Sequence, residues 1–406
     1  MRVTTLLNLL LNLPGLWVRG CEIHGDELVV NIRRRFRILT CPDCGTQVKG
    51  RFSKSKRRWR HLSIGAFKTY IRGSIRRLRC PNCQAVKTER VPWARPGARF
   101  TRPFEDAVGF LAQKLDKTAV AELTDISWVT VGQIAERLVA EKLPADRLDG
   151  LTKIGVDEIS YRRHHKYLTV VVDHEKGGVV WAGKGSSTKT LRQFFEELGP
   201  ERAKTIELVS IDMSAAYEKA IREAVPHAKI VFDRFHVAKL AQNAVTEVRR
   251  EKMRELAAEE KRWLKKSRWI LLKRPENRTK QEDERLSMIK KTNAPVYRAY
   301  LLKESFLNIF VRETRMQAEE DLRAWLKWAA RSRLKPFVRL GRTIRKHWDG
   351  VLQFIETKLS NGRLEGMNNK IRLLSHRSYG FHSAKALIAT IYLCCSKVEL
   401  PQLQLL

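Results

Sequence analysis

The sequence lacks any run of about twenty consecutive apolar residues, the length that a membrane-spanning helix requires. We therefore expect no membrane association. Acidic residues are also few: 44 Asp and Glu stand against 79 Lys and Arg among 406 residues, which gives a formal net charge of +35. An excess of this size indicates a polyanionic partner, because a merely soluble protein does not need so much charge of one sign. Nucleic acid is the partner that fits.

Two features place the protein in the cytoplasm. The opening segment has Arg2 followed by apolar residues, but polar residues interrupt it and it lacks an A-x-A cleavage site, so we expect a folded amphipathic segment rather than a signal peptide. Cysteine is scarce, with seven residues. Four of them form two C-P-x-C pairs instead of a disulfide framework, which is typical of a reducing compartment.

The paired cysteines predict one structural Zn²⁺. Cys41-Pro-Asp-Cys44 and Cys80-Pro-Asn-Cys83 place four thiols in two similar loops, each able to supply two corners of a tetrahedral site. A redox function is the alternative, and it is disfavoured because no thioredoxin-like unit accompanies the pairs. The other cysteines are expected to be buried packing residues: Cys21, Cys394 and Cys395.

The amino-terminal region is strongly basic. Residues 1–100 hold 22 Lys and Arg but only 5 Asp and Glu. Residues 21–40 and 59–79 alternate apolar with basic residues, which predicts strands with one buried and one cationic face. We expect residues 1–90 to form a zinc-binding β-ribbon domain that contacts DNA phosphates. The expected contact residues are Arg57, Arg58, Arg60, Arg76, Arg77 and Arg79.

Residues 91–150 are predicted to form a helix-turn-helix domain. Within TAVAELTDISWVTVGQIAERL, a short helix precedes a turn at 124–126, and Ser127 begins a second helix with apolar residues at helical spacing. This second helix would enter a major groove of DNA. Its predicted contact residues are Ser127, Thr130, Gln133 and Arg137. A small helical domain with an ordinary polar face is the alternative.

After residue 150 the pattern changes to strands. We predict strands at 154–159, 167–173 and 179–183 with a hairpin at 162–165, then a helix at 190–199, a strand at 206–211, a helix at 215–224 and a strand at 229–233. Three strands in hairpins followed by strand, helix and strand is the order of a ribonuclease H-like mixed sheet. Residues 151–236 hold 14 basic and 12 acidic residues, so this core is nearly neutral.

The rest of the chain is predicted to be helical. Residues 241–349 form a basic helical insertion between two parts of the core, 151–240 and 350–406. The predicted fold class is therefore a multidomain α+β protein with an interrupted ribonuclease H-like core. Trp325 and Trp328 belong to the insertion. We expect them to pack in its interior, with stacking on unpaired bases as the alternative.

Three carboxylates stand at positions suited to a metal site. Asp157 ends the first strand of the predicted sheet and Asp212 ends the fourth, which is its neighbour in this fold, so both side chains reach one edge of the sheet. Glu365 lies on a predicted helix in SNGRLEGMNNKIRLL, which Ser360 or Asn361 caps. Hard oxygen ligands of this kind suit two Mg²⁺ (or Mn²⁺) ions, which promote phosphoryl transfer in DNA.

The helix that carries Glu365 has a polar face. Helical spacing places a carboxylate, two amides and a cation on one side of it. We expect this face to meet the DNA backbone through Asn368, Asn369 and Arg372.

Position alone leaves other assignments open. Glu158, Asp173 and Asp233 lie close to the three carboxylates in sequence or in the expected sheet. Glu158 should point to the opposite face of its strand, and Asp173 should begin a hairpin turn. Asp157 and Asp212 could also serve only to end their strands.

Three blocks of the sequence are distinctive: GVDEIS, SIDMSAAYEKAIREAVPHAKIVFDRFHV and SNGRLEGMNNKIRLLSHRSYGFHS. With the paired cysteines, they resemble the ISL3-family insertion-sequence transposases over essentially the whole chain. The resemblance implies a ribonuclease H-like DDE transposase whose catalytic metal ligands are Asp157, Asp212 and Glu365. Asp233 and His236 belong to the second block, and for them a DNA-contacting role and a structural role both stay open.

The expected function follows from the resemblance and the chemistry together. The zinc ribbon and helix-turn-helix would bind the terminal inverted repeats of a bacterial element, and the core would cut the DNA there and join the freed 3′ hydroxyl to target DNA. Because two ends must react, we expect a homodimer on paired ends. Two alternatives are an inactive DNA-binding regulator derived from a transposase and a ribonuclease H-like nuclease without strand transfer.

Overall fold

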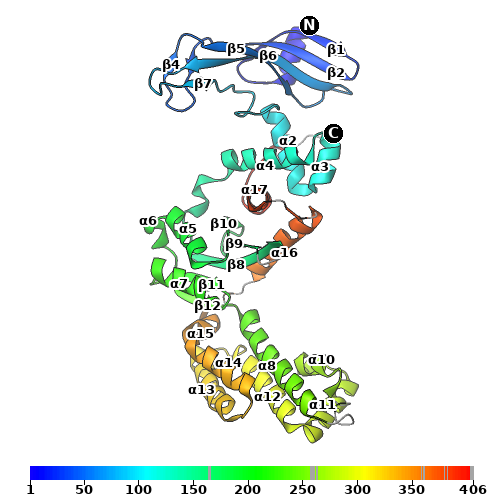
Figure 1. Cartoon of the computed structure of the whole chain (residues 1–406), viewed down its shortest axis with the longest axis vertical. Coiled ribbons are helices and arrows are strands. Elements are labelled where there is room, and N and C mark those ends of the chain that lie inside the picture. Colours follow the sequence, from blue (N-terminus) through cyan, green and yellow to red (C-terminus); the bar gives the residue numbers. More distant parts are fainter. Residues whose placement is uncertain are drawn as a thin grey trace. The chain divides into compact units, whose positions relative to one another are not determined.

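The structure is a computed structural model that describes residues 1–162, 166–256, 261, 264–357, 359, 362–378, 380–381 and 383–402 (Figure 1). The chain divides into two compact units, Met1–Pro144 with Arg377–Leu406, and Ala145–His376. Most of the predicted 162–165 hairpin and both predicted caps, Ser360 and Asn361, lie outside the described residues. Within those residues, no helix has both the length and the apolar character needed to cross a membrane.

The first unit begins with a basic sheet. Its elements are α1 (Val3–Leu11), β1 (Leu16–His24), β2 (Glu27–Arg34), β5 (Ser53–Arg60), β6 (Lys68–Arg79) and β7 (Val86–Thr88). The strand order is β1-β2-β6-β5, with β7 paired to β6. Strands are present where alternation predicted them, but each predicted segment holds more than one strand. The interior contains Trp59, Ile71 and Trp93, so the sheet has an apolar core beneath its cationic surface.

The predicted helix-turn-helix is confirmed. Its elements are α2 (Arg102–Lys114), α3 (Lys117–Thr124) and α4 (Trp128–Lys142). Asp125 ends α3 in a left-handed conformation with φ of 50°, and the Ser127 hydroxyl accepts a hydrogen bond from the Thr130 amide to cap α4. The turn therefore lies where the sequence predicted it.

The last helix, α17 (Ala384–Cys395), also belongs to the first unit. It packs against α2 and α4. The Gln113 side-chain amide of α2 donates to the carbonyl oxygens of Leu393 and Val398, both at 2.9 Å. This helix was predicted to be buried, and it is buried against the helix-turn-helix rather than against the sheet of the second unit.

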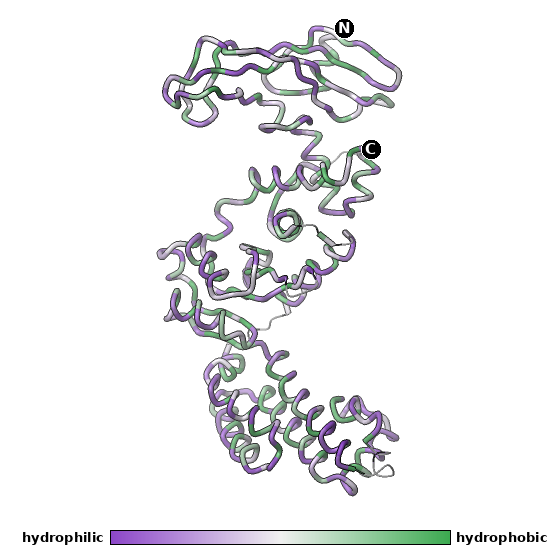
Figure 2. The backbone as a smooth tube through the Cα atoms, viewed as in Figure 1, coloured by the Kyte–Doolittle hydropathy of each residue, from purple (hydrophilic) through white to green (hydrophobic). Residues whose placement is uncertain are grey.

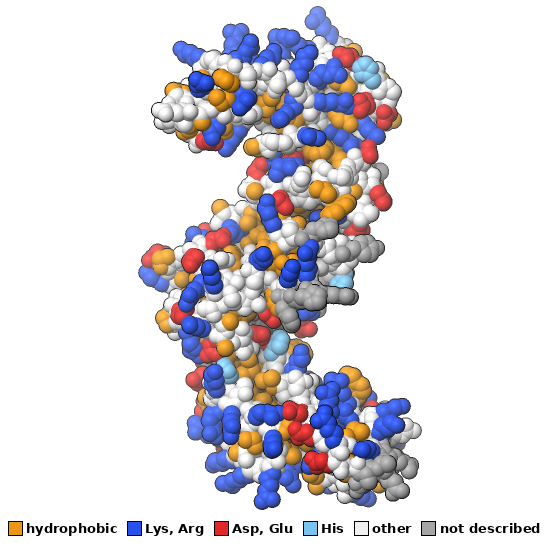
Figure 3. All heavy atoms as spheres, viewed as in Figure 1, with side chains coloured by type: hydrophobic (Ala, Val, Ile, Leu, Met, Phe, Trp, Pro, Cys, Tyr) orange, Lys and Arg blue, Asp and Glu red, His pale blue; other side chains and the backbone are white. Residues whose placement is uncertain are grey.

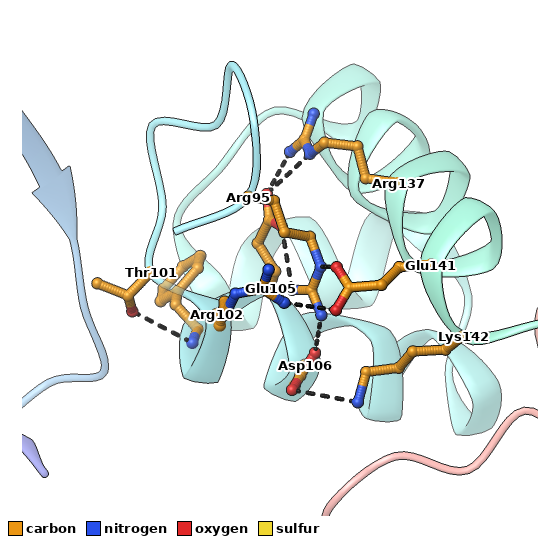
Figure 4. Close-up of polar contacts among 9 residues, drawn as sticks. Arg95, Thr101, Arg102, Glu105, Asp106, Arg137, Glu141 and Lys142 are labelled. Carbon is orange, nitrogen blue, oxygen red and sulfur yellow. Dashed lines mark hydrogen bonds and ion pairs between the residues drawn. The ribbon is translucent and has the colours of Figure 1, made fainter. Parts of the chain in front are cut away.

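Buried charges tie the helices of the first unit together (Figure 4). Glu105 is fully buried, and it forms ion pairs with Arg95, at 3.2 Å, and with Arg137. Arg95 is itself buried and also pairs with Asp106 at 2.7 Å and with Glu141 at 2.8 Å. A buried charge without its partner costs about 3–5 kcal/mol, so these residues act as one network.

The second unit is built on a mixed sheet. Its strands are β8 (Lys153–Arg162), β9 (Lys166–Asp173), β10 (Val179–Lys184), β11 (Leu208–Ile211) and β12 (Lys229–Phe232). The strand order is β10-β9-β8-β11-β12. The first three strands are antiparallel neighbours, whereas β11 runs parallel to both β8 and β12. This is the predicted ribonuclease H-like order.

Helices cover both faces of this sheet. On one face, α5 (Thr188–Leu198) and α7 (Ala215–Ala224) bury Phe194 and Tyr217 against Ile154 and Val156 of β8. On the other face lies α16 (Gly362–Arg377). A Cβ on Gly155 would come within 3.1 Å of the Leu364 side chain. Glycine at this point lets α16 approach the central strand closely.

The helical insertion follows β12. Its elements are α8 (Arg234–Glu255), α10 (Arg268–Leu272), α11 (Lys280–Thr292), α12 (Ala294–Ile309), α13 (Arg315–Arg331), α14 (Lys335–Lys346) and α15 (Trp348–Thr357). In Figure 2 these helices alternate hydrophilic and hydrophobic colours along their length, as helices with one buried side do. Trp325 is buried, and its indole donates to the Leu302 carbonyl at 2.8 Å, so the prediction of an interior position is confirmed. Trp328 is 37% exposed.

Candidate active site and zinc site

The three predicted catalytic carboxylates line one cavity of about 490 Å³ in the second unit. Asp157 comes from β8, Asp212 follows β11 directly, and Glu365 lies in the first turn of α16. Basic side chains share the cavity wall: His236, Lys239 and Arg372. The cavity therefore combines carboxylates with cations that suit a nucleic-acid backbone.

The sheet register explains why the two aspartates meet. Ser210 of β11 pairs with Gly155 of β8, and the strands are parallel. Two residues further along, Asp212 therefore lies level with Asp157, and adjacent strands are about 4.8 Å apart. Each aspartate also accepts a backbone hydrogen bond close in sequence: Asp157 from the Glu158 amide at 2.7 Å, and Asp212 from the Ser214 amide at 3.1 Å.

Asn368 of α16 forms a hydrogen bond with Asp157 of β8. Its side-chain nitrogen donates to Asp157 Oδ2 at 2.5 Å, and the side chain is only 3% exposed. Asn368 Oδ1 is buried and has no hydrogen-bond partner within the described residues. Asn368 lines the same cavity as Glu365 and Arg372, as their shared helix face predicted, but it is buried whereas Asn369 and Arg372 are exposed. Contact of these three residues with DNA stays a prediction.

The negative charges of Asp157 and Asp212 are only partly compensated by their surroundings. Burial raises the pKa of Asp157 above its usual range. Burial also raises the pKa of Asp212, and the negative charge of Asp157 raises it further. His236 partly offsets this, and its own pKa is raised chiefly by its hydrogen bond to Asp233, with 2.8 Å between Nδ1 and Oδ2. Buried carboxylates that repel each other are a suitable environment for a divalent cation.

Of the competing acids, Glu158 and Asp233 line the same cavity, whereas Asp173 does not. Asp173 is buried and accepts the amides of Glu175 and Lys176 at 2.7 and 3.1 Å, so it closes the predicted turn. Glu158 pairs in register with Thr169, whose hydroxyl contacts Tyr217 on the α7 side of the sheet. It reaches the cavity from the face opposite to Asp157.

The four paired cysteines form the predicted cluster in the first unit. Within the described residues, it is the one group of three or more potential ligands whose ligand atoms all lie within 4.8 Å of one another. Two sulfur–sulfur distances are 3.9 Å, for Cys41 and Cys83, and 3.4 Å, for Cys44 and Cys80. Tetrahedral Zn²⁺ with Zn–S bonds of about 2.3 Å needs sulfurs about 3.8 Å apart. The cluster fits Zn²⁺, whereas the three carboxylates line their cavity without closing on a single point.

The backbone of both cysteine loops is shaped alike. The Cys41 amide donates to the Thr46 carbonyl at 2.9 Å, and the Cys80 amide donates to the Ala85 carbonyl at 3.0 Å, the equivalent bond in the second loop. A left-handed residue follows each pair, Gly45 with φ of 76° and Gln84 with φ of 51°. The two loops thus turn in the same way around the sulfurs. The three other cysteines lie outside this cluster.

The predicted contact residues of the ribbon differ in accessibility. Arg57, Arg58, Arg77 and Arg79 are exposed, and the last two lie over the ring of Phe52 at 6.0 and 5.2 Å. Arg60 and Arg76 are half-buried. Arg60 donates to the Asp125 carbonyl at 2.8 Å, so its guanidinium joins the sheet to the turn of the helix-turn-helix.

On the helix-turn-helix, only part of the predicted set is free to meet DNA. Gln133 is exposed on α4. The Ser127 hydroxyl is used as the helix cap and lies 2.8 Å from the Thr130 hydroxyl. Arg137 is bound to Glu105 in the buried network, which sequence patterns did not reveal because Glu105 lies 32 positions away.

Comparison with known proteins agrees with this architecture. A family model described as a transposase, of the DDE type in the ISL3 family, matches residues 154–391. Residues 89–139 match the helix-turn-helix domain of transposase family ISL3, and residues 39–83 match the zinc-finger of transposases IS204, IS1001, IS1096 and IS1165.

Two curated relatives extend the similarity to the whole chain. The transposase for insertion sequence element IS1557 of Mycobacterium tuberculosis is 37% identical over 392 residues, covering 90% of this chain and 88% of that protein. The transposase for insertion sequence element IS1001 of Bordetella parapertussis is 29% identical over 363 residues, covering 89% of each. The chain therefore belongs to the ISL3 family of insertion-sequence transposases, enzymes that bind and cleave DNA.

Proposed function

We propose that Asp157, Asp212 and Glu365 hold two Mg²⁺ ions and catalyse both cleavage at the element ends and strand transfer. The observation that carries this proposal is their convergence on one cavity, with the two aspartates level on adjacent parallel strands. When bound, such ions activate the attacking oxygen and stabilise the leaving oxygen of a phosphodiester. The raised pKa values of Asp157 and Asp212 are consistent with a site completed by cations.

The chain's own residues have distinct tasks in this proposal. Asn368 orients Asp157 through its amide nitrogen. Arg372 and Lys239 are exposed at the cavity wall, where they would hold the DNA phosphates on either side of the cut bond. The hydrogen bond to Asp233 raises the pKa of His236 and so favours the positively charged form of this imidazole at the cavity. Binding and orientation of the scissile phosphate thus come from the same wall as the carboxylates.

A strand-transfer assay tests the reaction. Labelled terminal repeats incubated with the full-length protein, plasmid target and Mg²⁺ should give cleaved ends with free 3′ hydroxyls and joined products. Cleaved ends without joined DNA would support the nuclease alternative. Repeat binding without cleavage would support the regulator alternative.

We also propose that the zinc ribbon and helix-turn-helix recognise the terminal repeats, and that the protein acts in the bacterial cytoplasm, where its DNA lies. Because the reaction joins two ends, the working form would be a homodimer. Light scattering of the complex with two repeat ends should give the mass of two chains. A mass corresponding to one chain per pair of ends would contradict the dimer.

Loss of the Asn368 amide is expected to impair catalysis more than binding. Asn368→Ala should lower the rate of end cleavage about 10- to 100-fold, because partners that orient a metal ligand typically contribute this much. The Mg²⁺ concentration for half-maximal rate should rise, while terminal-repeat affinity stays unchanged. Leu373→Ala, an exposed position on the same helix, is the control. Unchanged Mg²⁺ dependence in Asn368→Ala would exclude an orienting role.

A further inference from the structure

The helical insertion has a surface on which the charged side chains are all positive. Residues 323–346 contain nine Lys and Arg and no Asp or Glu. All nine cations are exposed, and they lie on α13, α14 and the turn between them: Arg323, Lys327, Arg331, Arg333, Lys335, Arg339, Arg342, Arg345 and Lys346. We call this the α13–α14 basic surface. On the face of the molecule shown in Figure 3, blue side chains crowd over this part of the insertion.

The cations are ordered by the helices. On α13, Arg323, Lys327 and Arg331 recur every four residues, which places them on one side of the helix. On α14 a second row runs along residues 335, 339, 342 and 346, opposite the buried Phe337 and Ile344. The two helices pack against each other. Two neighbouring rows of cations, with successive charges about 5–6 Å apart, therefore face solvent together.

These charges are hardly neutralised by the protein. Arg339 pairs with Glu247, and Arg323 lies over the ring of Trp348. The other seven form no ion pair with a carboxylate in the described part of the chain. Elsewhere in the insertion, several cations pair with carboxylates, among them Arg278 with Asp283 and Arg315 with Glu319. Clustering so many like charges costs free energy that a bound polyanion would offset.

The surface lacks the amide side chains that read adenine. Residues 323–346 contain no Asn or Gln, which are typical donors to adenine. The two hydroxyl residues are used internally: Ser332 is buried and donates to the Ala329 carbonyl, and Thr343 donates to the Arg339 carbonyl. The remaining polar groups are Lys and Arg cations, which bind phosphates of any sequence.

We propose that the α13–α14 basic surface binds the phosphates of duplex DNA without regard to sequence, and so holds DNA outside the terminal repeats. That DNA is either the target or the flank of the element. The assignment of the bound DNA to these two sources rests on the proposed strand-transfer function, whereas the binding itself does not.

The test compares two triple variants of the full-length protein. Arg331→Gln/Arg342→Gln/Arg345→Gln removes three charges of the surface. Lys280→Gln/Lys290→Gln/Lys291→Gln removes three exposed charges from α11 of the same insertion, where Glu282, Asp283 and Glu284 are nearby. Affinity for a duplex of random sequence is measured against salt without divalent ions, so the result does not depend on the catalytic carboxylates.

The first variant should bind random duplex at least about tenfold more weakly at low salt, and its plot of log affinity against log salt should be shallower by about 2 to 3, since each phosphate contact contributes about 0.9. The α11 variant should change neither. Equal affinity and slope in both variants would overturn the proposal. With Mg²⁺, loss of joining with normal end cleavage identifies target DNA, and loss of cleavage only on repeats with long flanks identifies flanking DNA.

Discussion

Asp157→Asn, Asp212→Asn and Glu365→Gln are each expected to lower end cleavage and strand transfer by at least about 10³-fold. The loss corresponds to several kcal/mol of stabilisation of the phosphoryl-transfer transition state, at about 1.4 kcal/mol per tenfold change in rate. Binding of the terminal repeat should be retained, because the zinc ribbon and the helix-turn-helix lie in the other compact unit. The measurement is cleavage of a labelled repeat, with binding followed by fluorescence anisotropy.

The same aspartate substitutions are expected to raise thermal stability when divalent ions are absent. A carboxyl group whose pKa is raised by folding stabilises the folded state at low pH, and this contribution is lost as the pH rises through the raised pKa. Asp157 and Asp212 are such groups, so at neutral pH their charges oppose folding. In EDTA the unfolding temperature of Asp157→Asn should therefore exceed that of the wild type, and Mg²⁺ should raise only the wild-type value.

The control for the triad is Glu284→Gln, an exposed carboxylate on α11. It should leave cleavage and the response to Mg²⁺ intact. Wild-type cleavage in any of the three triad variants would refute the assignment of that residue. A triad variant that keeps the Mg²⁺-dependent rise in unfolding temperature would show that its carboxylate does not hold the ion.

Removal of the ribbon's zinc is expected to weaken recognition of the element ends. The sulfur cluster lies in a small satellite core with Leu39 and Leu78, separate from the main core of the ribbon's sheet. A structural zinc site contributes on the order of 10 kcal/mol to folding, which this small core cannot replace. Cys41→Ser should therefore lose bound zinc and weaken terminal-repeat binding at least about tenfold, since the proposed phosphate contacts of the ribbon require its fold.

Zinc content by elemental analysis and repeat binding by anisotropy are measured on the same samples. Cys21→Ser is the matched control, because Cys21 lies in the same sheet but outside the cluster. It should keep one zinc per chain and normal affinity. Full repeat affinity in zinc-free Cys41→Ser protein would show that the ribbon does not take part in end recognition.

The sequence was sufficient for the positions of the strands in the second unit and for the turn at Asp125, because both follow from local patterns: apolar runs bounded by turn residues for the strands, and a capping serine after a short helix for the turn. The strand order followed from the succession of hairpin strands, strand, helix and strand, which is that of a ribonuclease H-like sheet. The sequence also predicted the cluster of four cysteines from a local pattern. Paired loops with equal spacing leave few alternatives to a shared metal.

The burial of Asn368 was beyond a local pattern. A helical wheel groups Asn368 with Glu365, and both line the cavity, but Asn368 also belongs to the buried side of α16 with Leu364 and Ile371. These three positions have the spacing of a buried stripe. An amide side chain between two apolar residues of that stripe was the sequence signal that Asn368 is buried. The sequence also did not reveal the ion pair between Arg137 and Glu105, because only the packing of α2 on α4 brings these two residues together.

The position of α17 affects how such an element can lose activity. The chain passes through Glu365 on α16 before it returns to complete the helices that read DNA. A product truncated after α16 would leave the apolar sides of α2 and α4 uncovered, and we expect it to lose its affinity for the ends. A full-length copy with a substituted acidic residue would keep these helices covered and, under the proposed function, would compete for the ends. We therefore expect a substituted copy to inhibit an active element in the same cell and a truncated copy to leave it unaffected.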